Sequence, residues 1–237
     1  MKYKYIWLTA LLVVYTVFLN YYFVPVIGGT DSNGYHTCAK MIASQGQFHQ
    51  KPIDNFQFIG RMWVVNDRNE FYPKYPPLYP ALAAGTMRAF GNQAGFYLCP
   101  IMAVIAVCGM FFLCRFFMPE KFAAVGAFLL ATTPVFNHFA LSKVSHAPSM
   151  GFLIWGLVCF FAAVSRRNLK TGIIYATLAG LLLGYAEGTR YTNIILLIPP
   201  TLYGLLYLRK KRLWILFAFG CGVAVPYFFL AWFHWSS

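Results

Sequence analysis

The sequence is poor in charged residues, and acidic residues are the scarcest. Only 11% of its 237 residues are charged, with six Asp and Glu against 19 Lys and Arg. Hydrophobic residues reach 59% and aromatic residues 19%, which is far from the balance of a soluble domain. We therefore expect most side chains to face lipid or to pack between membrane helices.

Cysteine motifs and repeats are also missing. None of the six cysteines belongs to a CxxC pair, and most of them fall in apolar stretches, where cysteine behaves as a small hydrophobic residue. The cysteines thus predict neither a zinc site nor a redox centre. No internal repeat, coiled-coil heptad or low-complexity tract is visible.

Long apolar stretches, in contrast, are abundant. A helix needs roughly 20 apolar residues to cross a bilayer, and seven stretches approach that length. The first is too long for the core of a signal peptide and lacks a small-residue cleavage site, so we predict a retained span. The chain is thus predicted to be an all-α, polytopic transmembrane helix bundle, a single module over residues 1–237. The stretches are residues 6–27, 94–117, 122–140, 147–164, 172–186, 191–208 and 213–235.

The net charge of +13 might be read as a sign of nucleic-acid binding, but its distribution follows membrane orientation. If the N-terminus is cytoplasmic, the basic residues of the short loops all fall on the cytoplasmic side, as the positive-inside rule requires. We therefore predict that orientation and no nucleic-acid partner. The residues are Lys2, Lys4, Arg115, Lys121, Arg166, Arg167, Lys170, Arg209, Lys210, Lys211 and Arg212.

The extracytoplasmic face receives the long first loop, residues 28–93, and nearly all remaining polar chemistry. Long loops without a role are uncommon, so we expect function at this face. The apolar segment 76–90 would invert the downstream topology if it crossed the membrane, and we predict an interfacial or re-entrant helix there. All five histidines and five of the six acidic residues share this face: Asp31, Asp54, Asp67, Glu70 and Glu187.

Asp31 follows the first span, at or just before a short amphipathic helix predicted over residues 32–43. Two interpretations fit this position. Asp is a favoured N-cap residue, because its carboxylate accepts hydrogen bonds from free backbone N–H groups. A carboxylate at the membrane surface can also act as a base that accepts a proton from an attacking hydroxyl or amine.

Lys74 and Tyr75 precede the two prolines of FYPKYPPLYP, which favour the start of a helix. A lysine beside a helix N-terminus can bind a phosphate group at the headgroup level. The alternative is an interfacial lysine whose stem lies along apolar surface.

Two shorter segments add cations at the same face. HFALSKVSHAP brings His138, Lys143 and His146 together without a standard zinc spacing, so interfacial or capping roles are the more usual outcome. In GLLLGYAEGTRYTN, Glu187 and Arg190 are three residues apart and could form an ordinary ion pair. Arg190 could instead bind a phosphate through its guanidinium fork.

Taken in order, these features resemble the GT-C superfamily of membrane glycosyltransferases. The nearest branch holds the dolichyl-phosphate-mannose protein mannosyltransferases and the bacterial lipid A aminoarabinose transferase. The resemblance covers essentially the whole chain. It rests on Asp31 with Tyr35 and Ala39, on Pro76, Pro77 and Leu78, and on a Gly-rich span that ends in Thr189 and Arg190.

The resemblance implies a GT-C-like fold and a sugar donor carried on polyprenyl phosphate, which enters sideways from the lipid. The sugar would pass, with inversion, to a lipid, glycan or protein acceptor at the extracytoplasmic face, and the membrane would be the bacterial inner membrane. Asp31 would be the catalytic acceptor base, and Lys74 and Arg190 would bind the donor phosphate. The candidates for donor or acceptor contacts are Tyr35, Tyr75, His146 and Glu187.

No metal ligand is predicted, although some relatives need a divalent cation and others do not. Full-length relatives carry further helices or a soluble domain, so we expect this chain to correspond to their N-terminal core. The alternatives are an inactive truncated core, a transporter-like protein, and a lipid-phosphate-binding protein without catalysis. The predicted spans contain prolines but no acid or base near a centre, which argues against an ion-coupled carrier.

Overall fold

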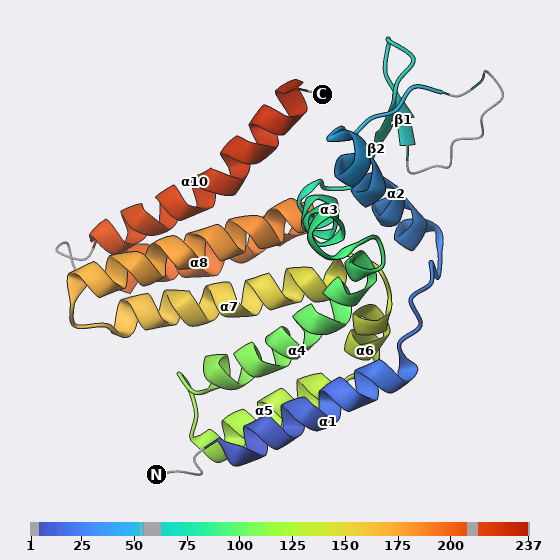
Figure 1. Cartoon of the computed structure of the whole chain (residues 1–237). Coiled ribbons are helices and arrows are strands. Elements are labelled where there is room, and N and C mark those ends of the chain that lie inside the picture. The colour runs from blue at the N-terminus through green and yellow to red at the C-terminus, as the bar shows by residue number, and fades with distance from the viewer. Residues whose placement is uncertain (1–4, 53, 55–62, 208–212, 237) are drawn as a thin grey trace.

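The computed structural model describes residues 5–52, 54, 63–207 and 213–236. Within these residues the chain is a bundle of helices with one two-stranded hairpin (Figure 1). The predicted all-α polytopic bundle is confirmed, and the hairpin is an addition that the sequence did not predict. Lys2, Lys4 and the basic run 209–212 lie outside the described residues.

All seven apolar stretches form helices, but these differ in length. Four are long and apolar enough to cross a membrane: α4 (Ala94–Cys114), α7 (His146–Ser165), α8 (Leu169–Thr189) and α10 (Leu213–Ser236). The bent pair of α5 (Glu120–Thr132) and α6 (Pro134–Leu141) gives a fifth candidate. The other two stretches are shorter. They form α1 (Ile6–Tyr22), and the 3₁₀ helix η1 (Tyr191–Leu197) continued by α9 (Ile198–Tyr207).

A proline causes the break between α5 and α6. Pro134 has no backbone N–H, and its ring disfavours helical backbone at the preceding residue. Thr133 is accordingly extended, with φ −68° and ψ 118°, and the two helices differ in direction by 58°. The Asn137 amide holds the bend, because it donates to the Ala131 carbonyl at 2.9 Å and accepts from the Tyr15 hydroxyl of α1 at 2.9 Å.

The connections between helices gather at two opposite ends of the bundle. The N-terminus, the α4–α5 turn and the α7–α8 turn share one end (Figure 1). Arg115 and Glu120 form an ion pair of 2.6 Å across the α4–α5 turn. The opposite end carries most of the long first loop, as the charge pattern predicted. Which end faces the cytoplasm stays a prediction.

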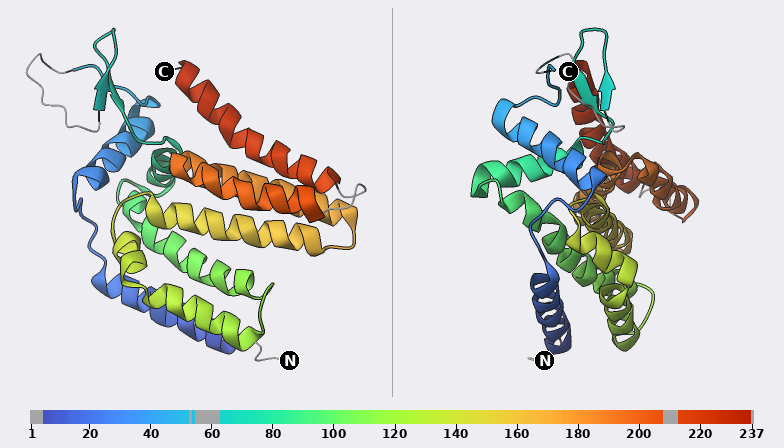
Figure 2. Two further views of the ribbon diagram at one scale, coloured as in Figure 1. Left: turned by 180° about the vertical axis from the view of Figure 1, so that it is seen from behind. Right: turned by 90° about the vertical axis from the view of Figure 1, so that its right-hand side faces the viewer.

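The long first loop is itself folded. It contains α2 (Thr30–Gln45), the strands β1 (Trp63–Val65) and β2 (Phe71–Pro73), and α3 (Leu78–Phe90). The strands pair in antiparallel fashion, with Val64 opposite Tyr72. At 13 residues α3 is too short to cross a bilayer. It lies across the end of the bundle (Figures 1 and 2). This position fits the predicted interfacial helix.

Lipid-facing and packed surfaces are both apolar, as a membrane environment requires. Leu129 of α5 and Phe228 of α10 are 58% and 75% exposed. Inside the bundle, α7, α8 and α10 share one group of buried side chains that includes Phe160, Leu183 and Ile215. The exposed apolar residues therefore belong to a surface that lipid covers, and the buried ones hold the helices together.

Glycines let α8 and α10 approach each other closely. A Cβ atom on Gly180 would overlap backbone atoms of Phe219, Gly222 and Val223, and one on Gly222 would overlap the backbone of Thr177 and Leu181. Small residues at such crossings allow backbone-to-backbone packing between membrane helices. The position of α10 on the bundle thus depends on these two glycines.

We predict that Gly180→Leu destabilises the bundle, because the new side chain must separate α8 from the α10 backbone. Overpacking of this kind costs about 1–3 kcal/mol or more. Thermal unfolding in detergent, followed by size-exclusion fluorescence, measures the loss. Gly220→Leu is the matched control, since nothing lies within 4 Å of a Cβ at Gly220. Equal melting temperatures for the two variants would contradict the prediction.

Candidate active site

Asp31 lies in the first turn of α2, at the end of the bundle that carries the long loop. The N-cap of this helix is Gly29, and no side chain caps it. The capping interpretation of Asp31 is therefore wrong. Its carboxylate is exposed and stays close to the helix N-terminus, where the helix dipole favours a negative charge.

Tyr75 contacts the Asp31 carboxylate from the segment that connects β2 to α3. Its hydroxyl donates to Asp31 Oδ1 at 3.2 Å. The ring lies against Gly34, where a Cβ atom would come within 2.6 Å of Tyr75 Cζ, and 4.3 Å from the Tyr35 ring, centroid to centroid. Gly34 therefore provides the space in which Tyr75 reaches Asp31. Burial raises the pKa of Tyr75, and the charge of Asp31 and its hydrogen bond add to this rise.

Tyr35 links α2 to the short loop between α6 and α7. The Tyr35 hydroxyl and Ser145 Oγ form a hydrogen bond of 2.9 Å, and Ser145 is completely buried. Burial raises the pKa of Tyr35, and the hydrogen bond from Ser145 opposes that rise. Arg190 also lowers this pKa and Asp31 also raises it. The two opposite charges thus act on the same phenol.

His146, the residue after Ser145, contacts Arg190. Arg190 Nη1 donates to His146 Nε2 at 2.6 Å, which requires the imidazole to be neutral with its proton on Nδ1. The imidazole also stacks on the Phe139 ring, with centroids 3.8 Å apart and planes 6° apart. Arg190 has extended backbone, φ −154° and ψ 106°, between α8 and η1. This break turns the guanidinium toward α7.

A groove of about 440 Å³ opens beside this pair. Its walls are largely apolar and include Leu130 of α5, Phe136 of α6 and Leu153 of α7. The polar residues of its lining include His146, Arg190, Ser149 and Asn193. Asn193 Nδ2 donates to Ser149 Oγ at 2.5 Å and to the Ala186 carbonyl at 2.8 Å. The groove therefore joins a long apolar surface to a cation.

Two of the predicted site residues do not join this arrangement. Lys74 is exposed and, among the residues that the structure describes, has no hydrogen-bond or ion-pair partner. Glu187 is only 4% exposed and accepts a hydrogen bond from Tyr227 of α10. It forms no ion pair with Arg190 within the described part of the chain. The structure thus pairs Arg190 with His146 rather than with Glu187.

The histidine and lysine segment HFALSKVSHAP divides into three environments. His138 is exposed, His146 contacts Arg190, and Lys143 is buried against His36 of α2 and the Phe96 ring. Residues that sequence reasoning missed are Ser145, Asn193, His36 and Phe139. No motif distinguishes them, because each acquires its role through a partner at least seven residues away in sequence.

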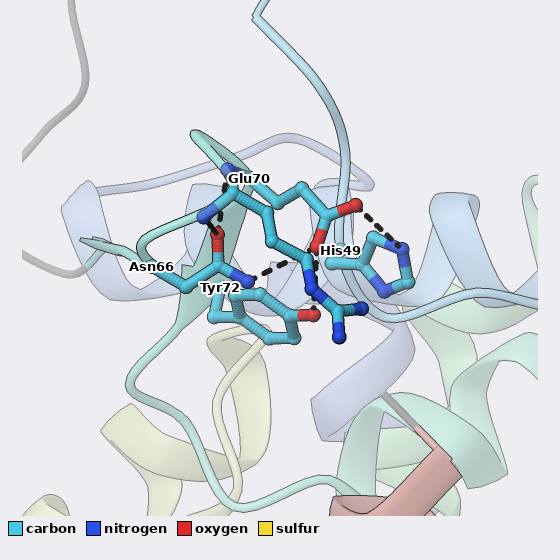
Figure 3. Close-up of polar contacts among 5 residues, drawn as sticks. His49, Asn66, Glu70 and Tyr72 are labelled. Carbon is cyan, nitrogen blue, oxygen red and sulfur yellow. Dashed lines mark hydrogen bonds and ion pairs between the residues drawn. The ribbon is translucent and has the colours of Figure 1, made fainter.

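A second polar cluster braces the outer hairpin (Figure 3). Glu70 accepts hydrogen bonds from Asn66 Nδ2 at 3.0 Å and from the Tyr72 hydroxyl at 3.2 Å, and it lies 3.9 Å from His49 Nε2. The Asn66 side chain also accepts from the backbone N–H of Arg68 and Glu70. These bonds close the turn between β1 and β2. Hydrogen bonding from Asn66 lowers the pKa of Glu70, so the cluster favours the ionised carboxylate.

Metal binding has no support among the described residues, which contain no group of three or more His, Cys, Asp or Glu side chains that could hold an ion. This finding concerns side chains alone. The absence of a metal ligand thus stays a prediction, and a divalent cation stays the alternative to it.

The fold and the site together define a class of protein: a helical membrane protein in which a chain of contacts connects an exposed acid, Asp31, to a cation, Arg190, that lines a largely apolar groove. The family described as dolichyl-phosphate-mannose-protein mannosyltransferase matches residues 74–235, more than half of the chain. The chain therefore belongs to this family of membrane glycosyltransferases. No curated protein and no solved structure matches the chain. The matched segment includes Lys74 and Arg190 but begins after Asp31 and Tyr35.

We predict that Tyr35→Phe weakens the attachment of α2, because it leaves the buried Ser145 hydroxyl without its partner. The cost of such a group is about 1–3 kcal/mol. Thermal unfolding of Tyr35→Phe, Ser145→Ala and the double variant forms a double-mutant cycle. The double variant is expected to be less destabilised than the sum of the single variants. Strict additivity would show that the bond does not couple α2 to the loop.

Proposed function

We propose that the chain transfers a sugar from a polyprenyl-phosphate donor to a lipid, glycan or protein acceptor at the extracytoplasmic face. The observation that carries this proposal is a chain of contacts that connects Asp31 to Arg190. Asp31 accepts from Tyr75, the Tyr75 ring lies against Tyr35, Tyr35 bonds Ser145, and the next residue, His146, accepts from Arg190. Transfer from a phosphate needs a base for the acceptor and a cation for the leaving group. An acid and a cation that one chain of contacts connects meet both needs.

In the proposed reaction, the acceptor oxygen or nitrogen attacks the anomeric carbon of the sugar, and its proton passes to the Asp31 carboxylate. The bond between that carbon and the phosphate oxygen breaks, and polyprenyl phosphate leaves with the electron pair. Arg190 stabilises the added negative charge, since a guanidinium pairs strongly with phosphate oxygens. Attack from the side opposite the phosphate inverts the anomeric centre.

The groove beside Arg190 supports a lipid-linked donor. Its apolar walls suit a prenyl chain, and its polar part offers Arg190, His146 and Asn193 to a headgroup. Both His146 and Asn193 already have protein partners, so Arg190 is the group with charge to offer the phosphate. Phosphate binding would compete with His146 for the guanidinium.

The remaining predicted residues take supporting roles in this proposal. Tyr75 donates to Asp31 and so keeps one carboxylate oxygen in a defined direction. Lys74 is exposed and adjacent to Tyr75, and it would supply a second cation for the donor phosphate. Glu187 faces Tyr227 of α10, so we assign it to helix packing rather than to the acceptor.

A lipid-phosphate-binding protein without catalysis is the second candidate. The same groove and the same Arg190 would serve it, and Asp31 would then be unnecessary. The two functions differ in whether removal of the Asp31 charge affects transfer, binding, or neither.

We predict that Asp31→Asn lowers the rate of sugar transfer by about 10²–10⁴-fold, the range that a general base contributes, and leaves donor binding within about twofold. Polyprenyl-phosphate mannose, the donor class in the family's name, is the first donor to assay with the purified chain in nanodiscs. Asp67→Asn removes an exposed acid in the hairpin turn and is the matched control. Transfer by Asp31→Asn at the wild-type rate would exclude the role of Asp31 as base.

Arg190→Gln is expected to weaken polyprenyl-phosphate binding by about tenfold or more, because a charge-assisted hydrogen bond contributes about 1.5–3 kcal/mol. Fluorescence titration with a labelled polyprenyl phosphate measures the dissociation constant. Arg167→Gln makes the same change in charge in the α7–α8 turn, at the other end of the bundle, and should bind as wild type does. If both variants bind equally well, the phosphate lies elsewhere.

A further inference from the structure

Helix α2, which carries Asp31, is bonded by Tyr75 and by Arg88 of α3, and it contacts the α6–α7 loop through two neighbouring polar contacts. One is the bond between Tyr35 and Ser145. The other joins His36, the next residue of α2, to Lys143 of the same α6–α7 loop, with Lys143 Nζ against His36 Nδ1. Lys143 and His36 are 3% and 7% exposed. Tyr35 and His36, which are adjacent in α2, thus contact Ser145 and Lys143, which are two residues apart in one loop.

The surroundings of Lys143 are unusual for a lysine. Its ammonium lies 3.9 Å from the centre of the Phe96 ring, a cation–π contact, and the His36 ring lies 4.9 Å from the same Phe96 ring, centroid to centroid, with a tilt of 36°. Among the described residues it forms no ion pair with a carboxylate. His36 must accept from the ammonium through Nδ1, so the imidazole is neutral and carries its proton on Nε2.

Other titratable groups around the pair come from three elements. Lys40 of α2 adds a second positive charge. Cys99 of α4 bonds Tyr79 of α3 and the carbonyl of Val144, the residue after Lys143. Burial lowers the pKa of His36 to about 4, and the charges of Lys143 and Lys40 contribute to this shift. Burial lowers the pKa of Lys143 to about 8 as well, helped by Lys40 and opposed by Cys99.

A buried ammonium without a counter-ion is costly, and an apolar side chain would fill the same space at lower cost. The polar pair, however, defines the orientation of α2. A hydrogen bond to one ring nitrogen holds α2 at a single rotation and height, whereas apolar contacts alone tolerate sliding. Rotation of α2 would move Asp31, which lies five residues before His36, away from Tyr75.

We propose that Lys143 and His36 are positioning residues, which hold α2 and thereby Asp31 against the α6–α7 loop, and that acid releases this docking through protonation of His36. The part that concerns Asp31 rests on the proposed function. The docking itself does not.

The direction of the pH effect follows from the lowered pKa values. When α2 lifts away, His36 regains its ordinary pKa of 6.5, so the undocked form binds a proton more readily than the docked form does. The contribution of neutral His36 to the free energy of docking is fully present above pH 6.5. It is lost as the pH falls from 6.5 toward 4. Lys143 acts in the same sense at alkaline pH, where docking strengthens further between pH 8 and 10.5.

Hydrogen–deuterium exchange of the full chain in nanodiscs tests the docking. Amide exchange in residues 30–45, corrected for the intrinsic effect of pH, is compared at pH 7.5 and pH 5.0. We expect the opening constant of α2 to rise about tenfold at pH 5.0 in the wild type, with no change in α7. His36→Gln retains a neutral acceptor and should remove this pH dependence. His138→Gln, which changes the exposed histidine of α6, should keep it.

Exchange in α2 that is the same at both pH values, or equally pH-dependent in His36→Gln, would overturn the docking proposal. A second variant covers the case in which His36→Gln does not fold. Lys143→Gln removes the adjacent charge and should reduce the pH effect severalfold, and an unreduced effect would also overturn the proposal.

Transfer assays then test the consequence for Asp31. Lys143→Gln is expected to lower kcat at least fivefold at pH 7.5 with the KM for the donor unchanged, because Arg190 and the groove are untouched. Unchanged kcat in a variant with altered α2 exchange would show that docking does not position Asp31. If the wild type transfers no sugar, the proposed function fails, while the exchange data still decide the docking.

Discussion

The candidate site depends on two hydrogen bonds made by neighbouring residues, Ser145 at the end of the short connection between α6 and α7 and His146 at the start of α7. Ser145 bonds Tyr35 of α2, and His146 accepts from Arg190 beyond the end of α8. The acid and the cation belong to elements far apart in the chain. They come together because both elements attach to these two neighbouring residues.

The membrane explains why the polar groups gather at one end of the bundle. A polar group among lipid chains needs a partner, and the partners are scarce in a sequence with few charges. Arg190 donates to His146, and Asn193 donates to Ser149, and these four residues line the groove. The groove is apolar along most of its lining, and these four residues supply polar groups that a headgroup would contact.

Backbone breaks give the groove its shape. Pro134 separates α5 from α6, and the extended Arg190 separates α8 from η1. Straight helices at both places would carry Phe136 and Arg190 in other directions. Two of the seven predicted spans depart from regular single helices, one through the break at Pro134 and the other through the 3₁₀ helix η1, because a span that lines a site gives up part of its regular hydrogen bonding. The frame of the bundle consists of the long, regular helices α4, α7, α8 and α10.

Much of the fold could be predicted from the sequence, and less of the site. Apolar length and the positions of basic residues are properties of single segments, so the helices, the two groups of loops and the interfacial segment over α3 could be read directly. Asp31, Tyr35, Tyr75, His146 and Arg190 could be chosen as candidates by residue type and by the family resemblance. Lys74 and Glu187 were chosen on the same grounds, and neither joins the cluster.

By itself the sequence determined that this chain is a membrane helix bundle with its polar chemistry at one end, because hydrophobicity and charge act locally along the chain. Only the tertiary structure decided that Tyr75 contacts Asp31, that Arg190 pairs with His146 rather than Glu187, and that Lys143 is buried against His36. Each of these contacts joins residues more than 40 apart in sequence. The packing of helices, and not the spacing of residues, determines which side chains meet.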